Sequence, residues 1–263
     1  MTKLSLGFIG FGNMATAIFD GLTKSHNTFS KVYVYEKAKK SLPKNIISTT
    51  HNDLIIKSDI IIIAVKPQQI NDIKPFFENN DLSKKCLVSI MAGTTIKTLS
   101  KLNPTLTSII RVMPNTAAQI QESISMLAKN KHCNKKFIDA VDNIFSSIGK
   151  TQIIDEAKMD IATALFGSGP AFIYQIMNEL TKICIESGFT KKDSDILLKQ
   201  LFYSTGKMAL NSNKSTSQLI KEICSPNGTT EAGLNKFKEL NIDIFLAQVI
   251  ESAKNRSKSL SNE

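Results

Sequence analysis

The sequence predicts an α/β fold, with an N-terminal Rossmann-like dinucleotide-binding domain over residues 1–155 and a C-terminal all-α domain over residues 156–263. Two observations support this prediction. Up to Asp155, short β-rich runs alternate with helical segments, which is the pattern of a parallel sheet covered by helices on both faces. After Asp155 the β-rich runs stop, and the remaining segments have the apolar spacing of helices.

The expected elements follow from these patterns in chain order. The strands are expected at residues 4–9, 31–35, 46–48, 59–64, 86–90, 108–112, 124–128 and 151–154, of which 46–48 has the weakest pattern. The helices of the second domain are expected at residues 159–188, 193–210, 215–224, 229–240 and 242–259. Gly188 and Asn211 stand where the first two of these helices should end.

The first expected strand leads directly into the glycine-rich turn GFGNMA at residues 10–15. Gly10 permits a tight turn, and Gly12 lets the backbone approach a phosphate without a side chain between them. The helix that begins at Asn13 and Met14 presents its free N–H groups to the anion. Because the motif follows a strand and precedes a helix, it indicates a dinucleotide site rather than an ordinary turn.

Other strand ends should meet this turn, because ligands of parallel sheets bind outside the carboxyl ends of the strands. The loops expected there contain Ala64, Val65, Lys66 and Pro67, then Ala92 and Gly93, and then Asn115. Pro67 stiffens its turn, and Lys66 would face the ribose or the phosphates. Ala92 and Gly93 are small enough for a flat nicotinamide ring to approach the backbone. Asn115 offers an amide to the same crevice.

Glu36, at the end of the second expected strand, bears on the choice of cofactor. An acidic side chain at this point accepts hydrogen bonds from the ribose hydroxyls, which favours NADH over NADPH. The lysines that follow, Lys37, Lys39 and Lys40, could instead hold a 2′-phosphate. The sequence therefore predicts NADPH or NADH as the cofactor and leaves the preference open.

Two segments of the helical domain have unusual composition. ALFGSGPAF at residues 164–172 places Gly167, Gly169 and Pro170 within a helical pattern, where Gly and Pro cost roughly 1 and 3 kcal/mol relative to Ala. This implies either a plain kink or a functional reason.

CSPNGTTEAGL at residues 224–234 is a polar turn that opens onto a helix. Backbone N–H groups at Gly228 and the hydroxyls of Ser225, Thr229 and Thr230 could bind a carboxylate there. The alternative is a simple N-cap by Thr229 or Thr230.

Composition limits the partners. The net charge is +10, but Arg111 and Arg256 are the only arginines among 33 basic residues, so we expect anionic small molecules rather than nucleic acid. No apolar run reaches the roughly 18 residues of a membrane span, so no membrane partner is expected.

The four cysteines are far apart without CxxC spacing, which predicts reduced thiols and no metal site. The first strand begins too early for a signal peptide, and we expect a cytoplasmic protein.

The expected helix at residues 159–188 is apolar nearly all round, so most of its surface should be buried. A helical domain of this size offers too little cover. We therefore expect a second copy of the chain to pack against it.

The motifs GFIGFGNMA, AVKPQ, MAG, RVMPN, ALFGSGPAF and SPNGTTEAGL occur in the order seen in pyrroline-5-carboxylate reductases, which this sequence resembles from residue 4 to about residue 240. Asn227 stands where the family usually has Gly. The resemblance implies NAD(P)H-dependent reduction of 1-pyrroline-5-carboxylate to L-proline, the last step of proline biosynthesis. It also implies a homodimer formed through the helical domains, often assembled into a decamer. The catalytic residue it implies is Thr230, with its hydroxyl within hydrogen-bond reach of the ring nitrogen.

Two other functions share some of these features. A reductase resembling β-hydroxyacid dehydrogenases shares the opening motif, but it needs a general-base lysine on the first interdomain helix. No lysine occurs between Met159 and Leu180. A non-enzymatic dinucleotide sensor would add a DNA-binding module or an arginine stripe, and the sequence has neither.

Overall fold

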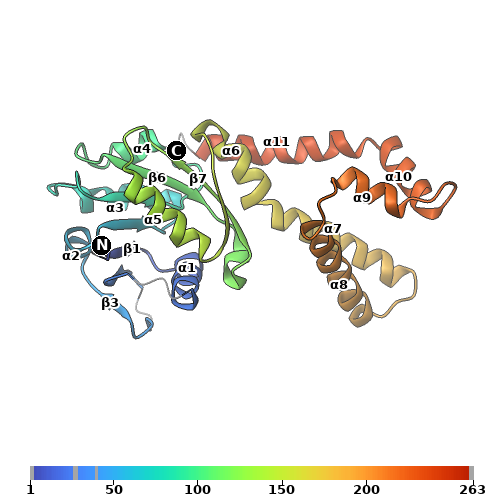
Figure 1. The fold of residues 1–263 in the computed structure, drawn as a ribbon, viewed down its shortest axis with the longest axis horizontal. Coiled ribbons are helices and arrows are strands. Elements are labelled where there is room, and N and C mark those ends of the chain that lie inside the picture. The colour runs from blue at the N-terminus through green and yellow to red at the C-terminus, as the bar shows by residue number, and fades with distance from the viewer. Residues whose placement is uncertain (1–2, 26–28, 39–40, 261–263) are drawn as a thin grey trace. The chain divides into compact units, whose positions relative to one another are not determined.

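The computed structural model describes residues 3–25, 29–38 and 41–260 (Figure 1). The chain forms two compact units. The sheet unit contains the residues up to Ser168 together with those from Glu251 onward, and the helical unit is Gly169–Ile250. The last strand ends at Ile153, close to the expected domain boundary at residue 155, whereas the two compact units divide at Ser168. The sheet unit additionally includes the short helices that follow that strand and the C-terminal end of the last helix.

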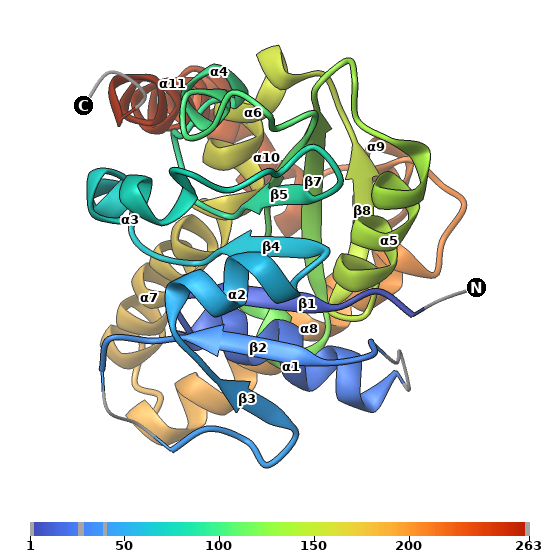
Figure 2. The same ribbon diagram turned by 90° about the vertical axis from the view of Figure 1, so that its left-hand side faces the viewer.

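The sheet unit is built on an eight-stranded sheet in the order β3-β2-β1-β4-β5-β6-β7-β8 (Figure 2). The strands are β1 (Leu6–Ile9), β2 (Val32–Tyr35), β3 (Ile46–Ser48), β4 (Ile60–Ile63), β5 (Cys86–Ser89), β6 (Ser108–Met113), β7 (Ser123–Lys129) and β8 (Gly149–Ile153). Each expected β-rich run forms a strand, including the weakest one at residues 46–48.

One strand departs from the expected parallel arrangement. β7 pairs antiparallel with β6, whereas the other neighbouring strands pair in parallel. The connection from β6 to β7 contains only the short 3₁₀ helix η2 (Thr116–Ile120). A parallel crossover needs about a dozen or more residues, so this short link requires the chain to reverse direction.

Helices cover both faces of the sheet. α1 (Asn13–Lys24) and α5 (Lys135–Ser146) pack on one face. α2 (His51–Lys57), α3 (Ile70–Phe77) and α4 (Ile96–Ser100) pack on the other. In β4, Ile60 and Ile62 belong to the first core and Ile61 and Ile63 to the second, and all four are fully buried. Burial on both faces explains why this strand is continuously apolar.

The order of the strands places a crevice beside β1. The chain passes from β1 outward to β2 and β3, and it then returns to the other side of β1 as β4. The helices after β1 and β4 therefore leave the sheet in opposite directions. In open α/β sheets this switch point, at the carboxyl ends of the strands, is where ligands bind.

The helix expected at residues 159–188 is not continuous, and this part of the prediction was wrong. The 3₁₀ helix η3 (Glu156–Lys158) and α6 (Met159–Ala162) lead into a π-helical turn, η4 (Thr163–Gly167). α7 (Gly169–Glu186) follows. Pro170 lies in the first turn of α7, and proline cannot donate the hydrogen bond that would continue the preceding helix.

The remaining helices form where the sequence predicts them. They are α8 (Lys191–Leu210), α9 (Thr216–Ile223), α10 (Thr229–Glu239) and α11 (Ile242–Leu260). The Thr190 hydroxyl caps α8 by accepting from the N–H of Asp193 at 3.1 Å. Gly188 has a φ of +97°, in the left-handed region, and ends α7 as expected.

Within a single chain, α7 has no buried residue. Its apolar side chains include Tyr174, which is 63% exposed, and Ile183, which is 56% exposed. This surface is unusually apolar for a protein face in contact with water.

Over the described ranges, no helix is both long enough and apolar enough to cross a membrane. Those same residues contain no cluster of three or more His, Cys, Asp or Glu side chains suited to a metal ion. The four cysteines are free thiols. Burial raises the pKa of Cys86, and a hydrogen bond from Cys86 lowers the pKa of Cys133.

Candidate active site

A pocket lies at the switch point, next to the carboxyl end of β1. It is lined by Ile9, Gly10, Phe11, Gly12, Tyr35, Glu36, Lys37, Ala64, Val65, Lys66, Gln69, Asp72 and Ile73. The structure therefore brings six of the predicted cofactor residues together, namely Gly10, Gly12, Glu36, Ala64, Val65 and Lys66.

The two glycines of the turn differ in the space that surrounds them. Gly10 has a φ of +83°, and a Cβ there would lie 2.7 Å from Cγ1 of Val65 and 3.0 Å from the carbonyl oxygen of Ala64. At Gly12, none of the residues that the structure describes lies within 4 Å of the Cβ position. Gly10 is therefore needed by the fold itself, whereas Gly12 leaves open space at the start of α1.

Gly12 is also the N-cap of α1, and within the described part of the chain this cap has no side-chain hydrogen bond. Asn13 and Met14 form the first positions of the helix. Because the first backbone N–H groups of a helix have no partner within it, this end is suited to an anion such as a pyrophosphate.

Phe11, between the two glycines, anchors the turn in the core. It is only 1% exposed and packs edge-on against Phe8 and Phe19, with ring centroids 5.6 Å and 6.2 Å away. No role for Phe11 is predicted from the sequence. An aromatic residue flanked by glycines in an exposed-looking turn is the signal that could have identified it.

The Glu36 carboxylate joins the end of β2 to the glycine turn. Oε2 accepts a hydrogen bond from the N–H of Phe11 at 2.8 Å, and Oε1 accepts one from the N–H of Ala38 at 3.0 Å. Beside it, Nζ of Lys37 lies 3.7 Å from Oδ2 of Asp72, on largely exposed side chains. Lys39 and Lys40, the other candidates for a 2′-phosphate, lie outside the described residues.

The loop after β4 forms the opposite side of the pocket. Pro67 begins the 3₁₀ helix η1 (Pro67–Gln69), and Oε1 of Gln69 accepts a hydrogen bond from the N–H of Lys66 at 3.1 Å. This bond fixes the turn that presents Lys66. Pro67 itself lines a neighbouring pocket, together with Gln68, Ile70, Asn71, Thr94, Thr98 and Leu260.

Ala92 and Gly93 are not among the residues that line the pocket beside Gly10. Gly93 is buried with a φ of +74°, and a Cβ there would lie 2.6 Å from Cβ of Leu260 and 3.0 Å from the carbonyl oxygen of Ser257. The C-terminal end of α11 therefore fills the space beside Gly93, which the sequence analysis had assigned to a nicotinamide ring. Ala92 is half-buried.

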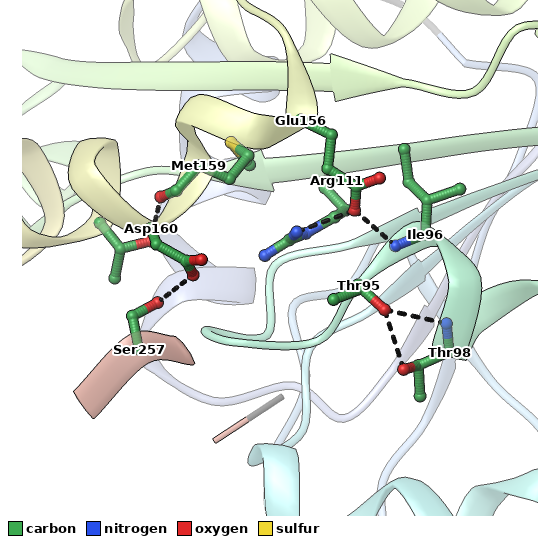
Figure 3. A network of polar contacts seen from close by, with 9 residues as sticks. Thr95, Ile96, Thr98, Arg111, Glu156, Met159, Asp160 and Ser257 are labelled. Carbon is green, nitrogen blue, oxygen red and sulfur yellow. Dashed lines mark hydrogen bonds and ion pairs between the residues drawn. The ribbon is translucent and has the colours of Figure 1, made fainter. Parts of the chain in front are cut away.

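Polar contacts join this end of α11 to α6, and join η3 to the residues that follow the Gly93 turn (Figure 3). The Ser257 hydroxyl donates to Oδ1 of Asp160 at 2.7 Å. Oε1 of Glu156 accepts from Nη1 of Arg111 at 2.9 Å and from the N–H of Ile96 at 2.7 Å. Arg111 is only 4% exposed. Glu156 thus supplies the counter-charge that a buried guanidinium requires.

Asn115 does not offer its amide to the pocket. The residue is 9% exposed, and its Oδ1 accepts a hydrogen bond from the N–H of Ala117 at 3.1 Å, which caps η2. Its Nδ2 donates to the carbonyl oxygen of Phe166 at 3.1 Å. Both polar atoms are thus engaged within the sheet unit, and the expected contact with the cofactor crevice is corrected to a structural one.

The polar turn before α10 has a definite local geometry. The N–H of Gly228 donates to the carbonyl oxygen of Ser225 at 3.0 Å, and the N–H of Asn227 donates to Oε2 of Glu231 at 2.7 Å. Asn227 has a φ of +57°. Asn tolerates this left-handed conformation better than most residues, which explains how it replaces the usual Gly.

The N-cap of α10 is Gly228, without a side-chain capping bond. The alternative that Thr229 or Thr230 acts as the N-cap is therefore wrong, because both residues lie inside the first turn of the helix. Ser225 and Thr229 are exposed and Thr230 is half-buried. Thr229 and Thr230 are the first two residues of α10, and Ser225 lies three residues before the N-cap.

Comparison with known proteins identifies the family of the chain. The family model "Pyrroline-5-carboxylate reductase dimerisation" matches residues 156–260, and the model "NADP oxidoreductase coenzyme F420-dependent" matches residues 5–93. The pyrroline-5-carboxylate reductase of Methanosarcina acetivorans is 32% identical, and the match covers 99% of each chain. The chain belongs to the pyrroline-5-carboxylate reductase family.

Solved structures of this reductase family share the whole fold. A Plasmodium falciparum pyrroline carboxylate reductase with NADP bound is similar with a TM-score of 0.85 and 30% identity, and 99% of each chain is covered. The 1-pyrroline-5-carboxylate reductase of Streptococcus pyogenes gives a TM-score of 0.84 and 28% identity, covering 98% of this chain and 100% of that one.

Several residues of the pocket in this reductase were not predicted from the sequence. Tyr35, Gln69 and Asp72 line it together with the predicted residues. Gln69 directly follows the AVKPQ motif, so its place in the loop after β4 was the available signal. Asp72 lies on α3 and is brought to the pocket only by the packing of that helix, which no local pattern indicates.

Proposed function

We propose that this chain reduces 1-pyrroline-5-carboxylate to L-proline with NADPH or NADH, as the last step of proline biosynthesis. The observation that carries the proposal is the family membership, which extends over the whole length of the chain. The dinucleotide crevice of the sheet unit and the polar turn of the helical unit provide, separately, the two kinds of site that this reaction needs.

The crevice fits a dinucleotide on the geometry of its own residues. The open space at Gly12 and the uncapped start of α1 suit a pyrophosphate, which Gly10, Gly12, Asn13 and Met14 would hold. Ala64, Val65, Lys66 and Pro67 would flank it, and Glu36 would face the adenosine ribose. Ala92 remains the predicted neighbour of the nicotinamide, while Gly93 and Asn115 would act through the packing described above.

When bound, the reduced nicotinamide supplies a hydride to the carbon of the imine. The chain's own task is then orientation and exclusion of water rather than strong acid catalysis. An imine is most electrophilic when its nitrogen is protonated, and the basic product amine keeps that proton. No His or Lys side chain is therefore required as a proton donor.

The turn before α10 would bind the substrate. The first N–H groups of the helix, at Thr229 and Thr230, would hold the carboxylate beside Gly228, whose own N–H donates to the Ser225 carbonyl oxygen. The Ser225 hydroxyl would add a further donor. The Thr230 hydroxyl would form a hydrogen bond with the ring nitrogen. This bond would orient the ring and so determine which of its faces receives the hydride. Thr230 is thus proposed as the catalytic residue, and Ser225, Gly228 and Thr229 as substrate-binding residues.

We further propose a homodimer formed through the helical unit. The match to the dimerisation model over residues 156–260 supports it, as does the exposed apolar surface of α7. Further assembly into a decamer is a prediction that rests on the family resemblance. A cytoplasmic location and the absence of nucleic-acid and membrane partners are predictions from composition.

Oxidation of the reduced cofactor, measured with and without the imine, tests the proposed function. The purified protein is incubated with NADPH or NADH, with and without 1-pyrroline-5-carboxylate, while the absorbance of the reduced nicotinamide is followed. We expect the absorbance to fall only when the imine is present, with at least one of the two cofactors. A constant absorbance with both cofactors would exclude this function.

A further inference from the structure

The chain leaves the sheet unit through an irregular turn. The π-helical turn η4 (Thr163–Gly167) ends with the N–H of Ser168 donating to the carbonyl oxygen of Thr163 at 2.9 Å. Ser168 is the last residue of the sheet unit before Gly169 begins the helical unit. Such π turns occur mostly as single turns within α-helices and frequently at functional sites.

The carbonyl group of Phe166 is where the helical hydrogen bonding breaks. In a continuous α-helix this oxygen would accept a hydrogen bond from the N–H of residue 170. Residue 170 is a proline, which has no N–H to donate. Asn115 supplies a replacement, because its Nδ2 donates to the Phe166 oxygen at 3.1 Å.

Asn115 is held firmly enough to serve this purpose. Its own N–H donates to the hydroxyl of Ser123 at 3.1 Å, and its Oδ1 accepts from the N–H of Ala117 at 3.1 Å. Because Oδ1 is committed to that N–H, the NH₂ group must be the part that points to Phe166. The side chain is nearly buried, so water does not compete strongly for the bond.

A second contact joins the same two segments. A Cβ at Gly167 would lie 2.5 Å from Cε of Met113, which is the last residue of β6. Gly167 therefore leaves the space that Met113 occupies. The end of β6 and the loop after it thus meet the π turn at two successive residues, with a hydrogen bond from Asn115 at Phe166 and a close packing contact of Met113 at Gly167.

We propose that Asn115 is a positioning residue for imine reduction, acting through the carbonyl of Phe166 to hold the turn that leads into the helical unit. This inference rests on the proposed function, in which the sheet unit binds the dinucleotide and the helical unit binds the imine. Hydride transfer then requires groups from both units at once. A loose turn at Ser168 would lower the rate of that step while the dinucleotide pocket stays intact.

The first test replaces Asn115 with Asp, which keeps the shape and the capping oxygen but removes the donor to Phe166. We expect kcat for the imine to fall about tenfold, the loss of one well-placed hydrogen bond. The Kd for NADPH or NADH should stay within about twofold of the wild type, a change of less than 0.5 kcal/mol. Asn115→Ser, which keeps a good capping residue, serves if the Asp variant does not fold.

The matched control is Asn134. Its Oδ1 caps α5 by accepting from the N–H of Lys136 at 2.9 Å, the same capping role that Asn115 has for η2. Asn134→Asp and Asn134→Ser should leave kcat unchanged. If they do, a fall in kcat caused by the Asn115 substitutions cannot be attributed to the loss of a helix-capping asparagine as such.

The decisive test introduces Pro170→Ala, which restores an N–H at position 170 and thereby a helical donor for Phe166. In this background the Asn115 substitutions should lower both kcat and Tm by clearly less than they do in the wild type. Equal losses in both backgrounds would overturn the proposal, because Asn115 would not be replacing the missing donor.

Two other results would also overturn it. A dinucleotide Kd that weakens in step with kcat would mean that Asn115 contacts the cofactor. A lowered Tm with unchanged kcat would mean a purely structural role. If the wild-type protein does not reduce the imine at all, the proposed function fails, whereas the coupling of Asn115 with Pro170 is still measured through Tm.

Discussion

The carboxylate of Glu36, at the end of β2, accepts a hydrogen bond from the backbone N–H of Phe11 at 2.8 Å. Phe11 lies between the two glycines of the turn that would hold the pyrophosphate. The residue expected to contact the ribose therefore also fixes the glycine turn. Changes at Glu36 should consequently affect both the choice of cofactor and the order of this loop.

Glu36→Gln separates these two roles. Gln keeps an oxygen that can accept from Phe11 but has no negative charge, so repulsion of a 2′-phosphate is removed. We expect the ratio of kcat/KM for NADPH to that for NADH to rise about tenfold, which corresponds to roughly 1.4 kcal/mol. Glu36→Ser should shift the ratio in the same direction and also lower Tm. An unchanged ratio in both variants would show that Glu36 does not face the ribose.

Thr230→Val tests the proposed catalytic hydroxyl. Because Gly228 rather than Thr230 is the N-cap of α10, the substitution removes no capping bond, and Tm should change little. If the hydroxyl orients the imine, its loss should cost roughly 1–3 kcal/mol, or about tenfold to a hundredfold in kcat/KM for the imine. Cofactor Kd should be unaffected.

Thr229→Val is the matched control for Thr230, one position earlier in the same helical turn. Its backbone N–H is retained, so it should keep most of the wild-type kcat/KM. Wild-type kinetics in Thr230→Val would refute the catalytic role of that hydroxyl.

Asn227→Gly and Asn227→Ala test the left-handed residue of the substrate turn. Asn227 has a φ of +57°, a conformation that costs other non-glycine residues roughly 1–2 kcal/mol. Asn227→Gly should therefore keep both activity and Tm, whereas Asn227→Ala should lose about 1 kcal/mol of folding free energy. Urea denaturation of the three proteins measures this difference. Equal stability of the Ala and Gly variants would contradict the assigned conformation.

Gly93→Ala and Gly12→Ala form a contrasting pair. At Gly93 a methyl group would meet the backbone of α11, and the positive φ adds strain, so Ala should cost about 2 kcal/mol or more of stability. At Gly12 nothing lies within 4 Å, so Ala should fold normally and weaken dinucleotide binding. Thermal melting and dinucleotide titration of both variants test this. A stable Gly93→Ala protein would mean that α11 does not pack on this turn.

The parts of the fold that could be predicted are those set by local patterns. The continuous isoleucines of β4 and the GFGNMA turn are recognisable because neighbouring residues determine their structure. The antiparallel course of β7 was missed because it depends on the length of its connection to β6. The partner of Gly93 comes from the other end of the chain, at Leu260, and no local pattern indicates that contact.

Long-range packing also determines the contacts of site residues whose roles were predicted from local patterns. Asn115 follows a strand end, where a ligand contact is the usual expectation. Its actual partner is a carbonyl freed by Pro170, and only the packing of α6 against β7 and of η4 against β6 brings the two together. For Thr230, the sequence could suggest a cap or a catalytic role, and the observed N-cap at Gly228 removes the first of these.

The most direct test of the account is to follow the hydride itself. The protein is incubated with 1-pyrroline-5-carboxylate and NADPH or NADH carrying deuterium at the transferable position of the nicotinamide, and the product is analysed by mass spectrometry and NMR. The account predicts L-proline with one deuterium at the ring carbon that was double-bonded to nitrogen, formed in equal amount to the oxidised cofactor. Cofactor oxidation without labelled proline, or no imine-dependent oxidation with either cofactor, would contradict it.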